Sequence, residues 1–83
     1  MWHVYIIECK DKTLYTGVTT DIDRRIKEHN SGHGGRFTRS RTPVKLVYNQ
    51  KAANRSGALK CEAEIKKLNR SGKLDLISAA ISL

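Results

Sequence analysis

The sequence predicts an α+β fold in which a three-stranded antiparallel sheet is flanked by helices, in the order strand, strand, helix, strand, helix, helix. Three short apolar runs with period-two alternation indicate the strands. Amphipathic helical segments follow the second and third runs. With 83 residues, the chain is expected to form a single domain over residues 1–83.

The composition is ordinary for a soluble protein except for its charge. Sixteen Lys and Arg against eight Asp and Glu give a net charge of +8, which attracts polyanions and favours a nucleic acid as partner. Cys9 and Cys61 are far apart and not in a CxxC pair, which excludes a disulfide framework and fits a cytoplasmic protein. No stretch approaches the roughly 20 apolar residues of a membrane span, and no signal peptide is expected.

The first two strands are expected to form a hairpin. Apolar and polar residues alternate over residues 2–7 and 14–18, and Lys10 to Lys12 is the expected turn.

The length of this turn decides where the tyrosines lie. A three-residue turn places Ile7 opposite Tyr15 and Tyr5 opposite Gly17, so that both phenols share one face of the sheet. A turn of two or four residues would separate the phenols.

A helix is expected next, over residues 21–30. Thr20 and Asp23 resemble a capping box with Asp in place of Glu, and Asn30 to Gly32 is typical of a helix end. Helical spacing aligns four side chains on one face: Ile22, Arg25, Ile26 and His29. A guanidinium beside an apolar wall requires an anion or a fixed partner. The alternatives are that Arg25 reaches past the helix edge to water and that His29 is a structural boundary histidine.

A basic segment follows, over residues 31–45, and it contains no acidic residue. It is expected to be a loop that contacts a phosphate backbone through its cations and offers one ring for stacking, with the candidate residues Arg36, Phe37, Arg39, Arg41 and Lys45. The alternative is a solvated loop whose charges only keep the protein in solution.

The third strand is expected at Val44 to Tyr48, with a turn at Asn49 to Ala53. A helix from Asn54 or Ser56 to Leu68 should then pack through the stripe Ala58, Cys61, Ile65 and Leu68.

One carboxylate of this helix lies within its packing stripe. Glu62 falls between the apolar positions, whereas Glu64 faces away, within reach of Lys60 and Lys67. A carboxylate on a buried stripe should be neutralised, hydrogen-bonded or bound to a cation. A structural salt bridge between Glu62 and Arg25 is the alternative.

A last helix is expected over residues 72–80, capped by Ser71. Its stripe of Leu74, Ile77 and Ile81 should cover the sheet or a partner subunit.

These residues together resemble the GIY-YIG nuclease family, and more closely its small single-domain bacterial and archaeal members. The first signature reads His3-Val4-Tyr5 instead of Gly-Ile-Tyr, and the second reads Tyr15-Thr16-Gly17 instead of Tyr-Ile-Gly. Arg25 and His29 follow at the family's spacing, and Glu62 matches its metal-binding glutamate. The late asparagine of many members has no secure counterpart, because Asn69 comes too early.

The resemblance implies an endonuclease that hydrolyses nucleic-acid phosphodiesters, with DNA favoured over RNA and a role related to DNA repair or recombination. It implies that Glu62 holds one Mg²⁺ or Mn²⁺, that Arg25 binds a non-bridging phosphate oxygen, and that Tyr5 or Tyr15 takes the proton from water. His29 would position a tyrosine or the phosphate. No separate DNA-reading domain fits in the chain, so cleavage should be structure-directed or of low specificity, with targeting by a partner protein or a homodimer.

Two alternatives to a nuclease remain open. One is a nucleic-acid-binding module with the same fold and charge that cleaves nothing. The other is a metal site that combines five thiol and imidazole groups of poor ligand spacing, from His3, Cys9, His29, His33 and Cys61.

Overall fold

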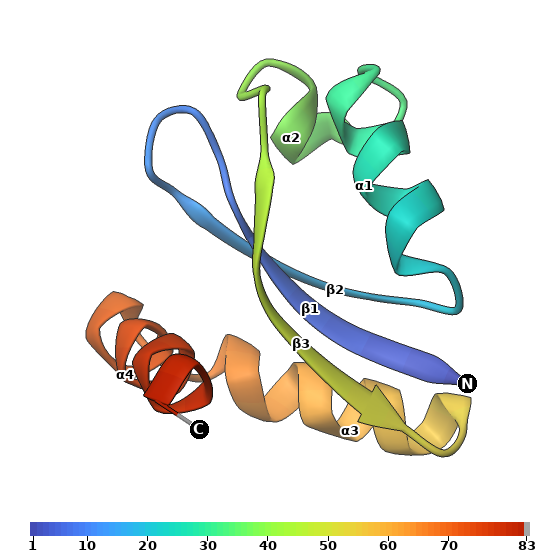
Figure 1. Cartoon of the computed structure of the whole chain (residues 1–83), viewed down its shortest axis with the longest axis vertical. Coiled ribbons are helices and arrows are strands. Elements are labelled where there is room, and N and C mark those ends of the chain that lie inside the picture. The colour runs from blue at the N-terminus through green and yellow to red at the C-terminus, as the bar shows by residue number, and fades with distance from the viewer. Residues whose placement is uncertain (83) are drawn as a thin grey trace.

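The computed structural model describes residues 1–82, with side chains for residues 1–80, and it confirms the α+β class. Three strands form one antiparallel sheet in the order β2-β1-β3 (Figure 1). Their bounds are Trp2–Glu8 for β1, Leu14–Thr19 for β2 and Lys45–Ala52 for β3. The central strand is therefore β1, which pairs along its length with both neighbours.

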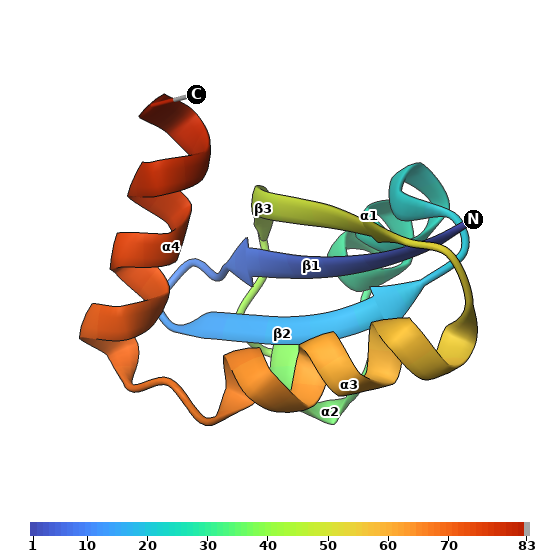
Figure 2. The same ribbon diagram turned by 90° about the horizontal axis from the view of Figure 1, so that it is seen from below.

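In residues 1–82, four helices accompany the sheet, with bounds Ile22–Asn30 for α1, Arg36–Arg39 for α2, Arg55–Lys66 for α3 and Arg70–Ser82 for α4. In Figure 2, α3 runs along the sheet near β2, and α4 stands across the end of the sheet where the turn joins β1 to β2. Within the described residues, no helix has the length and apolar character needed to cross a membrane.

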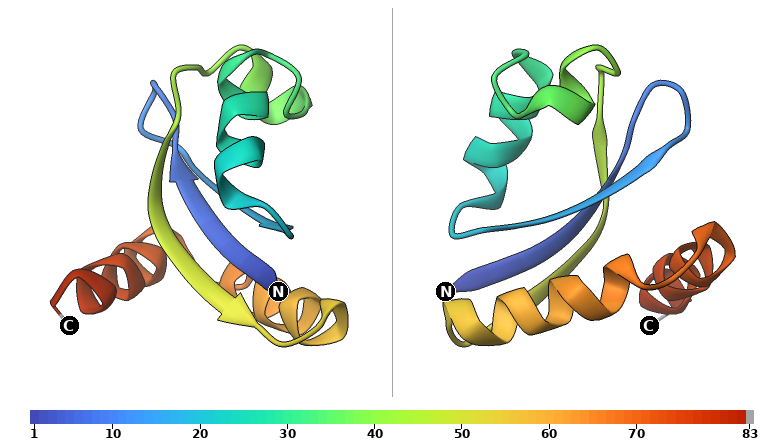
Figure 3. Two further views of the ribbon diagram at one scale, coloured as in Figure 1. Left: turned by 45° about the vertical axis from the view of Figure 1, so that its right-hand side comes forward. Right: turned by 180° about the vertical axis from the view of Figure 1, so that it is seen from behind.

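Alternation along β1 divides the core into two clusters, one on each face of the sheet. On one face, Val4 and Ile6 pack against Ala58 and Ile65 of α3 and Ile77 of α4. The other cluster comprises Tyr5, Ile7, Cys9 and Val44, with Tyr15, Ile22 and Ile26 packed against it. The opposed positions of α1 and α3 can be followed in Figure 3. The phenols thus lie on the α1 side.

The third strand is longer than expected, and the turn predicted at Asn49 to Ala53 is wrong. Residues 49–52 continue the ladder with β1, where Lys51 pairs with His3 and Ala52 pairs with Trp2. The His3 ring also hydrogen-bonds the Asn49 side chain at 3.1 Å. Pairing with a central strand outweighs the turn-forming composition of this segment.

The basic segment was expected to be a loop throughout, but residues Arg36–Arg39 form the one-turn helix α2. This turn is anchored from inside, because Thr38 is 1% exposed and hydrogen-bonds His29. A helix of four residues is too short to show a helical repeat of apolar residues, so the sequence pattern does not indicate α2.

The helix ends also differ in detail from the expected ones. Asp21, not Thr20, caps α1, and its carboxylate accepts from the Arg24 amide at 3.0 Å. The last helix begins before Ser71, and the Asn69 side chain accepts from the Gly72 amide at 2.8 Å. These caps fit the preference of Asp and Asn for helix starts.

The apolar stripes of the last two helices are shorter than expected. Leu68 lies beyond α3 and is 39% exposed, and Leu74 is 40% exposed, whereas Ile77 is buried. The side chain of Ile81 lies outside the described part of the chain.

Candidate active site

The β1–β2 turn has the length that brings the two phenols together. The backbone amide of Cys9 donates to the Thr13 carbonyl at 2.9 Å across a turn of three residues. Lys12, the last residue of this turn, has a φ of 72°. This geometry is typical of a three-residue hairpin loop. The predicted pairing of Tyr5 with Gly17 and of Ile7 with Tyr15 is confirmed, and both phenol rings lie beside the ring of His29, at centroid distances of 6.0 Å (Tyr5) and 5.7 Å (Tyr15).

The Tyr5 ring occupies the space above Gly17. A Cβ atom at Gly17 would lie 2.6 Å from the Tyr5 hydroxyl oxygen, so only glycine lets the phenol cross β2. Tyr5 is 1% exposed, and this burial raises the pKa of its hydroxyl. Arg25 lies close enough to act in the opposite direction on the same pKa.

His29 links two hydroxyl groups in the interior. It is fully buried, with Nε2 at 3.0 Å from the Tyr5 hydroxyl and Nδ1 at 2.7 Å from Thr38 Oγ1. Burial lowers the pKa of His29, and the positive charge of Arg25 lowers it further. A neutral imidazole between two hydroxyls is suited to hold a tyrosine in place.

This depressed pKa predicts how stability changes with pH. The folded protein resists protonation of His29 and the unfolded chain does not, so its contribution to the free energy of unfolding is complete above the ordinary His pKa of 6.5 and is lost as pH falls below it. We expect urea unfolding between pH 7.5 and 5.5 to show this decline. His29→Gln should flatten it, whereas His33→Gln, at an exposed site, should keep it. An equal decline in the His29→Gln protein would contradict the prediction.

Arg25 is fixed at the edge of this cluster. Its Nη2 donates to the Gly34 carbonyl at 2.6 Å, and its Nη1 lies 3.2 Å from Glu28 Oε1. Its side chain is 29% exposed. The alternative of a salt bridge between Arg25 and Glu62 is therefore wrong, because Glu28 supplies the carboxylate.

Glu62 projects from α3 with a side chain that is 19% exposed, and its Oε2 lies 3.4 Å from Lys66 Nζ. Burial is the main cause of the raised pKa of Tyr5, and the charge of Glu62 adds the smallest contribution, although α3 packs on the opposite face of the sheet. Glu64 is 75% exposed and pairs with Lys67, as expected.

A half-buried single carboxylate fits Mg²⁺ or Mn²⁺, since these ions keep several waters and need few protein ligands. In residues 1–80 no group of three His, Cys, Asp or Glu side chains could hold a metal ion. The alternative site built from five thiol and imidazole groups is therefore not formed. Four of its five members have other hydrogen-bond partners: His3 bonds Asn49, His29 bonds Tyr5 and Thr38, His33 bonds Ser31, and Cys61 bonds Gln50.

Two of the four cations in the basic segment form ion pairs with acidic residues from elsewhere in the chain. The lack of acidic residues within the segment had suggested that all four would be unpaired. Arg41 lies 3.0 Å from Asp11, and Lys45 lies 3.4 Å from Glu8. Arg36 and Arg39 are exposed, and neither forms an ion pair with another described residue. The cations open to a phosphate backbone are therefore those of α2.

The Phe37 ring already has protein partners. It stacks on Tyr15 with centroids 5.5 Å apart and an interplanar angle of 22°, and the Arg41 guanidinium lies 4.3 Å from its centroid. Phe37 thus supports the second phenol, and its ring is less available to a base than its 39% exposure suggests.

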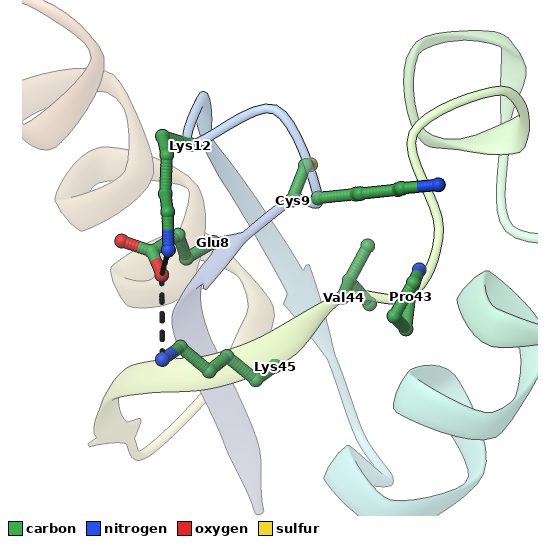
Figure 4. A pocket seen from close by; sticks show the side chains of 7 residues that line it. Glu8, Cys9, Lys12, Pro43, Val44 and Lys45 are labelled. Atoms are coloured by element: carbon green, nitrogen blue, oxygen red, sulfur yellow. Dashed lines mark ion pairs between the residues drawn. The ribbon is translucent and has the colours of Figure 1, made fainter.

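A pocket of about 220 Å³ lies at the hairpin turn, and neither phenol lines it (Figure 4). Three lysines surround it, and Glu8 bridges two of them, Lys12 and Lys45. None of the five residues proposed for catalysis lines this pocket.

Two residues of the cluster were missed by sequence reasoning. Thr38 and the Gly34 carbonyl complete the surroundings of His29 and Arg25. The adjacent glycines Gly34 and Gly35 were a weak signal for close approach of the backbone, and nothing in the sequence distinguished Thr38 from its polar neighbours.

Known proteins resemble this chain along most of its length. A UPF0213 protein of Syntrophus aciditrophicus is 57% identical over 76 residues, covering 90% of this chain and 87% of that protein. A UPF0213 protein of Haloquadratum walsbyi is 53% identical, covering 89% and 83%. The solution NMR structure of a UPF0213 protein from Bacillus halodurans has a TM-score of 0.62 at 48% identity, covering 95% of this chain and 85% of that one.

The family description that matches is the GIY-YIG catalytic domain, over residues 1–75. This range includes both tyrosine signatures, α1 and Glu62 of α3. The chain belongs to the GIY-YIG family of nucleases and is similar to its small UPF0213 members.

Proposed function

We propose that the protein is a metal-dependent endonuclease that hydrolyses nucleic-acid phosphodiesters, acts on DNA structure or with low specificity, and serves DNA repair or recombination. The observation that carries the proposal is the arrangement around Tyr5. This phenol is hydrogen-bonded to a buried histidine, and the charges of Arg25 and Glu62 act on it from two different helices.

Phosphodiester hydrolysis needs a proton acceptor for water and a positive charge for the phosphate. Arg25 would donate to a non-bridging oxygen, because its guanidinium has further N–H groups and is held by Gly34 and Glu28. Tyr5 or Tyr15 would accept the proton from water, and the other phenol would orient it. Burial opposes ionisation of Tyr5, so the base needs the positive charge beside it.

Glu62 would hold the divalent ion, which supplies positive charge to the phosphate and the 3′ leaving oxygen when bound. Arg36 and Arg39 would contact the backbone of the nucleic acid beside the site.

The test compares two glutamates of the same helix. Single-stranded, duplex, flapped and nicked DNA are incubated with the pure protein and Mg²⁺ or Mn²⁺. We expect Glu62→Gln to lower the cleavage rate by roughly 100-fold or more, as for loss of a group that stabilises transition-state charge. Glu64→Gln is the matched control and should leave the rate unchanged, since Glu64 is exposed and paired with Lys67. Cleavage that survives Glu62→Gln would overturn the proposal.

The second candidate is a binding module that does not cleave, and it is favoured by the exposed Arg36 and Arg39 together with the net charge of +8. Both functions predict an affinity for DNA that falls steeply with salt. Only the nuclease predicts a metal-dependent product, so the same assay separates the two.

A further inference from the structure

The hydroxyl of Thr38 lies at the far end of a hydrogen-bonded line that begins at Tyr5. Tyr5 bonds Nε2 of His29 at 3.0 Å, and Nδ1 of the same ring bonds Thr38 Oγ1 at 2.7 Å. All three residues are at most 1% exposed. Water is therefore excluded from competing for these hydrogen bonds.

We propose that Thr38 is a positioning residue that donates its hydroxyl proton to Nδ1 of His29, fixes the ring as the Nε2–H tautomer, and so makes His29 a donor to the Tyr5 oxygen. The inference deepens the proposed nuclease function, and its role in cleavage rests on that function. The hydrogen bonds themselves exist without nucleic acid or metal.

The direction of the line follows from counting protons. A neutral imidazole carries one N–H, so each arrangement leaves one hydroxyl proton without an acceptor within the line. If Nδ1 donated to Thr38, the leftover proton would belong to Thr38, for which the described residues provide no second side-chain partner. If Thr38 donates, the leftover proton belongs to Tyr5. Both hydroxyls are buried, so the choice between them rests on their neighbours. The negative charge of Glu62 acts on the Tyr5 oxygen and favours a proton there, whereas His29 is the one described side-chain partner of Thr38 Oγ1.

This arrangement suits a phenol that must lose or share its proton. The Tyr5 oxygen would accept from Nε2–H of His29, with the Arg25 guanidinium nearby, and both stabilise negative charge on that oxygen. The remaining Tyr5 proton is then not held by His29. Without Thr38, nothing in the described contacts of Nδ1 selects this tautomer.

Thr38 also lies between two candidate phosphate contacts. It is buried in α2 while Arg36 and Arg39 of the same turn are exposed. A backbone phosphate bound by these arginines would steady the turn that places Thr38 against His29. Helix α2 thus connects the exposed arginines to the hydrogen bonds of Tyr5 through the side chain of Thr38.

The test reads the tautomer directly. Two-bond ¹H–¹⁵N correlation spectra of the imidazole groups are recorded near pH 7.5 for wild type, Thr38→Ser and Thr38→Val, without nucleic acid or metal. We expect one neutral tautomer with the proton on Nε2 in wild type and Thr38→Ser. In Thr38→Val we expect a mixture of tautomers or the Nδ1–H form.

Thr16→Val is the matched control for loss of a buried threonine hydroxyl. Thr16 is 2% exposed, and its Oγ1 has no hydrogen-bond partner among the described residues. Its removal should leave the His29 spectrum unchanged. A wild-type ring in the Nδ1–H form, or a Thr38→Val ring identical to wild type, would overturn the inference, and the wild-type spectrum decides even if Thr38→Val fails to fold.

Cleavage kinetics of the Thr38 variants distinguish a role in positioning Tyr5 from a role in binding the nucleic acid. Thr38→Val should lower kcat by roughly tenfold with KM unchanged, by analogy with the partners that orient metal-binding histidines, and Thr38→Ser should restore kcat. A rise in KM alone would contradict a positioning role. If wild type does not cleave, the proposed function fails and the tautomer spectra still decide this inference.

Discussion

Replacement of Arg25 by lysine is expected to reduce cleavage by roughly 100-fold or more while the protein stays folded. Lysine keeps the positive charge and one possible bond to the Gly34 carbonyl, but it lacks the fork that holds Gly34, Glu28 and a phosphate oxygen at the same time. The loss should appear mainly in kcat, because the contact to the phosphate strengthens as charge develops in the transition state.

Single-turnover cleavage of a nicked or flapped duplex measures this loss, and circular dichroism checks the fold. Arg24→Lys is the matched control, since Arg24 is the preceding residue of the same helix and is exposed. Arg24→Lys should cleave like wild type. If Arg25→Lys cleaves at the wild-type rate, a positive charge without the guanidinium geometry is sufficient. Arg25 would then not have the proposed role of a specific donor to the phosphate oxygen.

Replacement of Gly34 by alanine is expected to destabilise the protein by about 2–3 kcal/mol, because overpacking forces the surroundings to move. The added Cβ would lie 2.2 Å from Nδ1 of His29 and 2.6 Å from its Cα. The second contact is with backbone, so a rotation of the ring alone cannot relieve it. The bond from Arg25 to the Gly34 carbonyl should be lost in the same change.

Thermal unfolding measures this effect, and each kcal/mol corresponds to roughly 4–8 °C in Tm for a domain of this size. Gly57→Ala is the control, since its Cβ would meet only the Asn54 side chain at 3.4 Å, and it lies within α3. That variant should be as stable as wild type or more stable, by up to about 1 kcal/mol. A Gly34→Ala protein with an unchanged Tm would contradict the packing described around His29.

The parts of the site that sequence could predict are those set by local periodicity. Alternation and a three-residue turn were enough to place Tyr5 and Tyr15 on one face, as the β1–β2 register confirms. Helical spacing separated Glu62 from Glu64, and the structure gives them 19% and 75% exposed side chains.

The parts that could not be predicted depend on contacts between distant segments. The bond from His29 to Thr38, the stacking of Phe37 on Tyr15 and the pairing of Arg41 with Asp11 all join residues from different elements. Local propensity carries no information about such contacts, so the composition of residues 31–45 predicts a loop where the structure has the short helix α2. The extension of β3 was missed for the same reason, because its last residues are ordered by β1.

The position of Tyr5 on the middle strand links the proposed catalytic phenol to the cooperative unfolding of the sheet. Central strands bonded on both sides usually belong to the slowest-exchanging unit of a fold and open only when the molecule unfolds globally. Tyr5 pairs with Gly17 on one side and Asn49 on the other. A shift of one residue would turn its ring to the opposite face. Partial opening that spares this strand leaves the phenol in place, and Tyr5 should leave its position only when the entire native structure is lost.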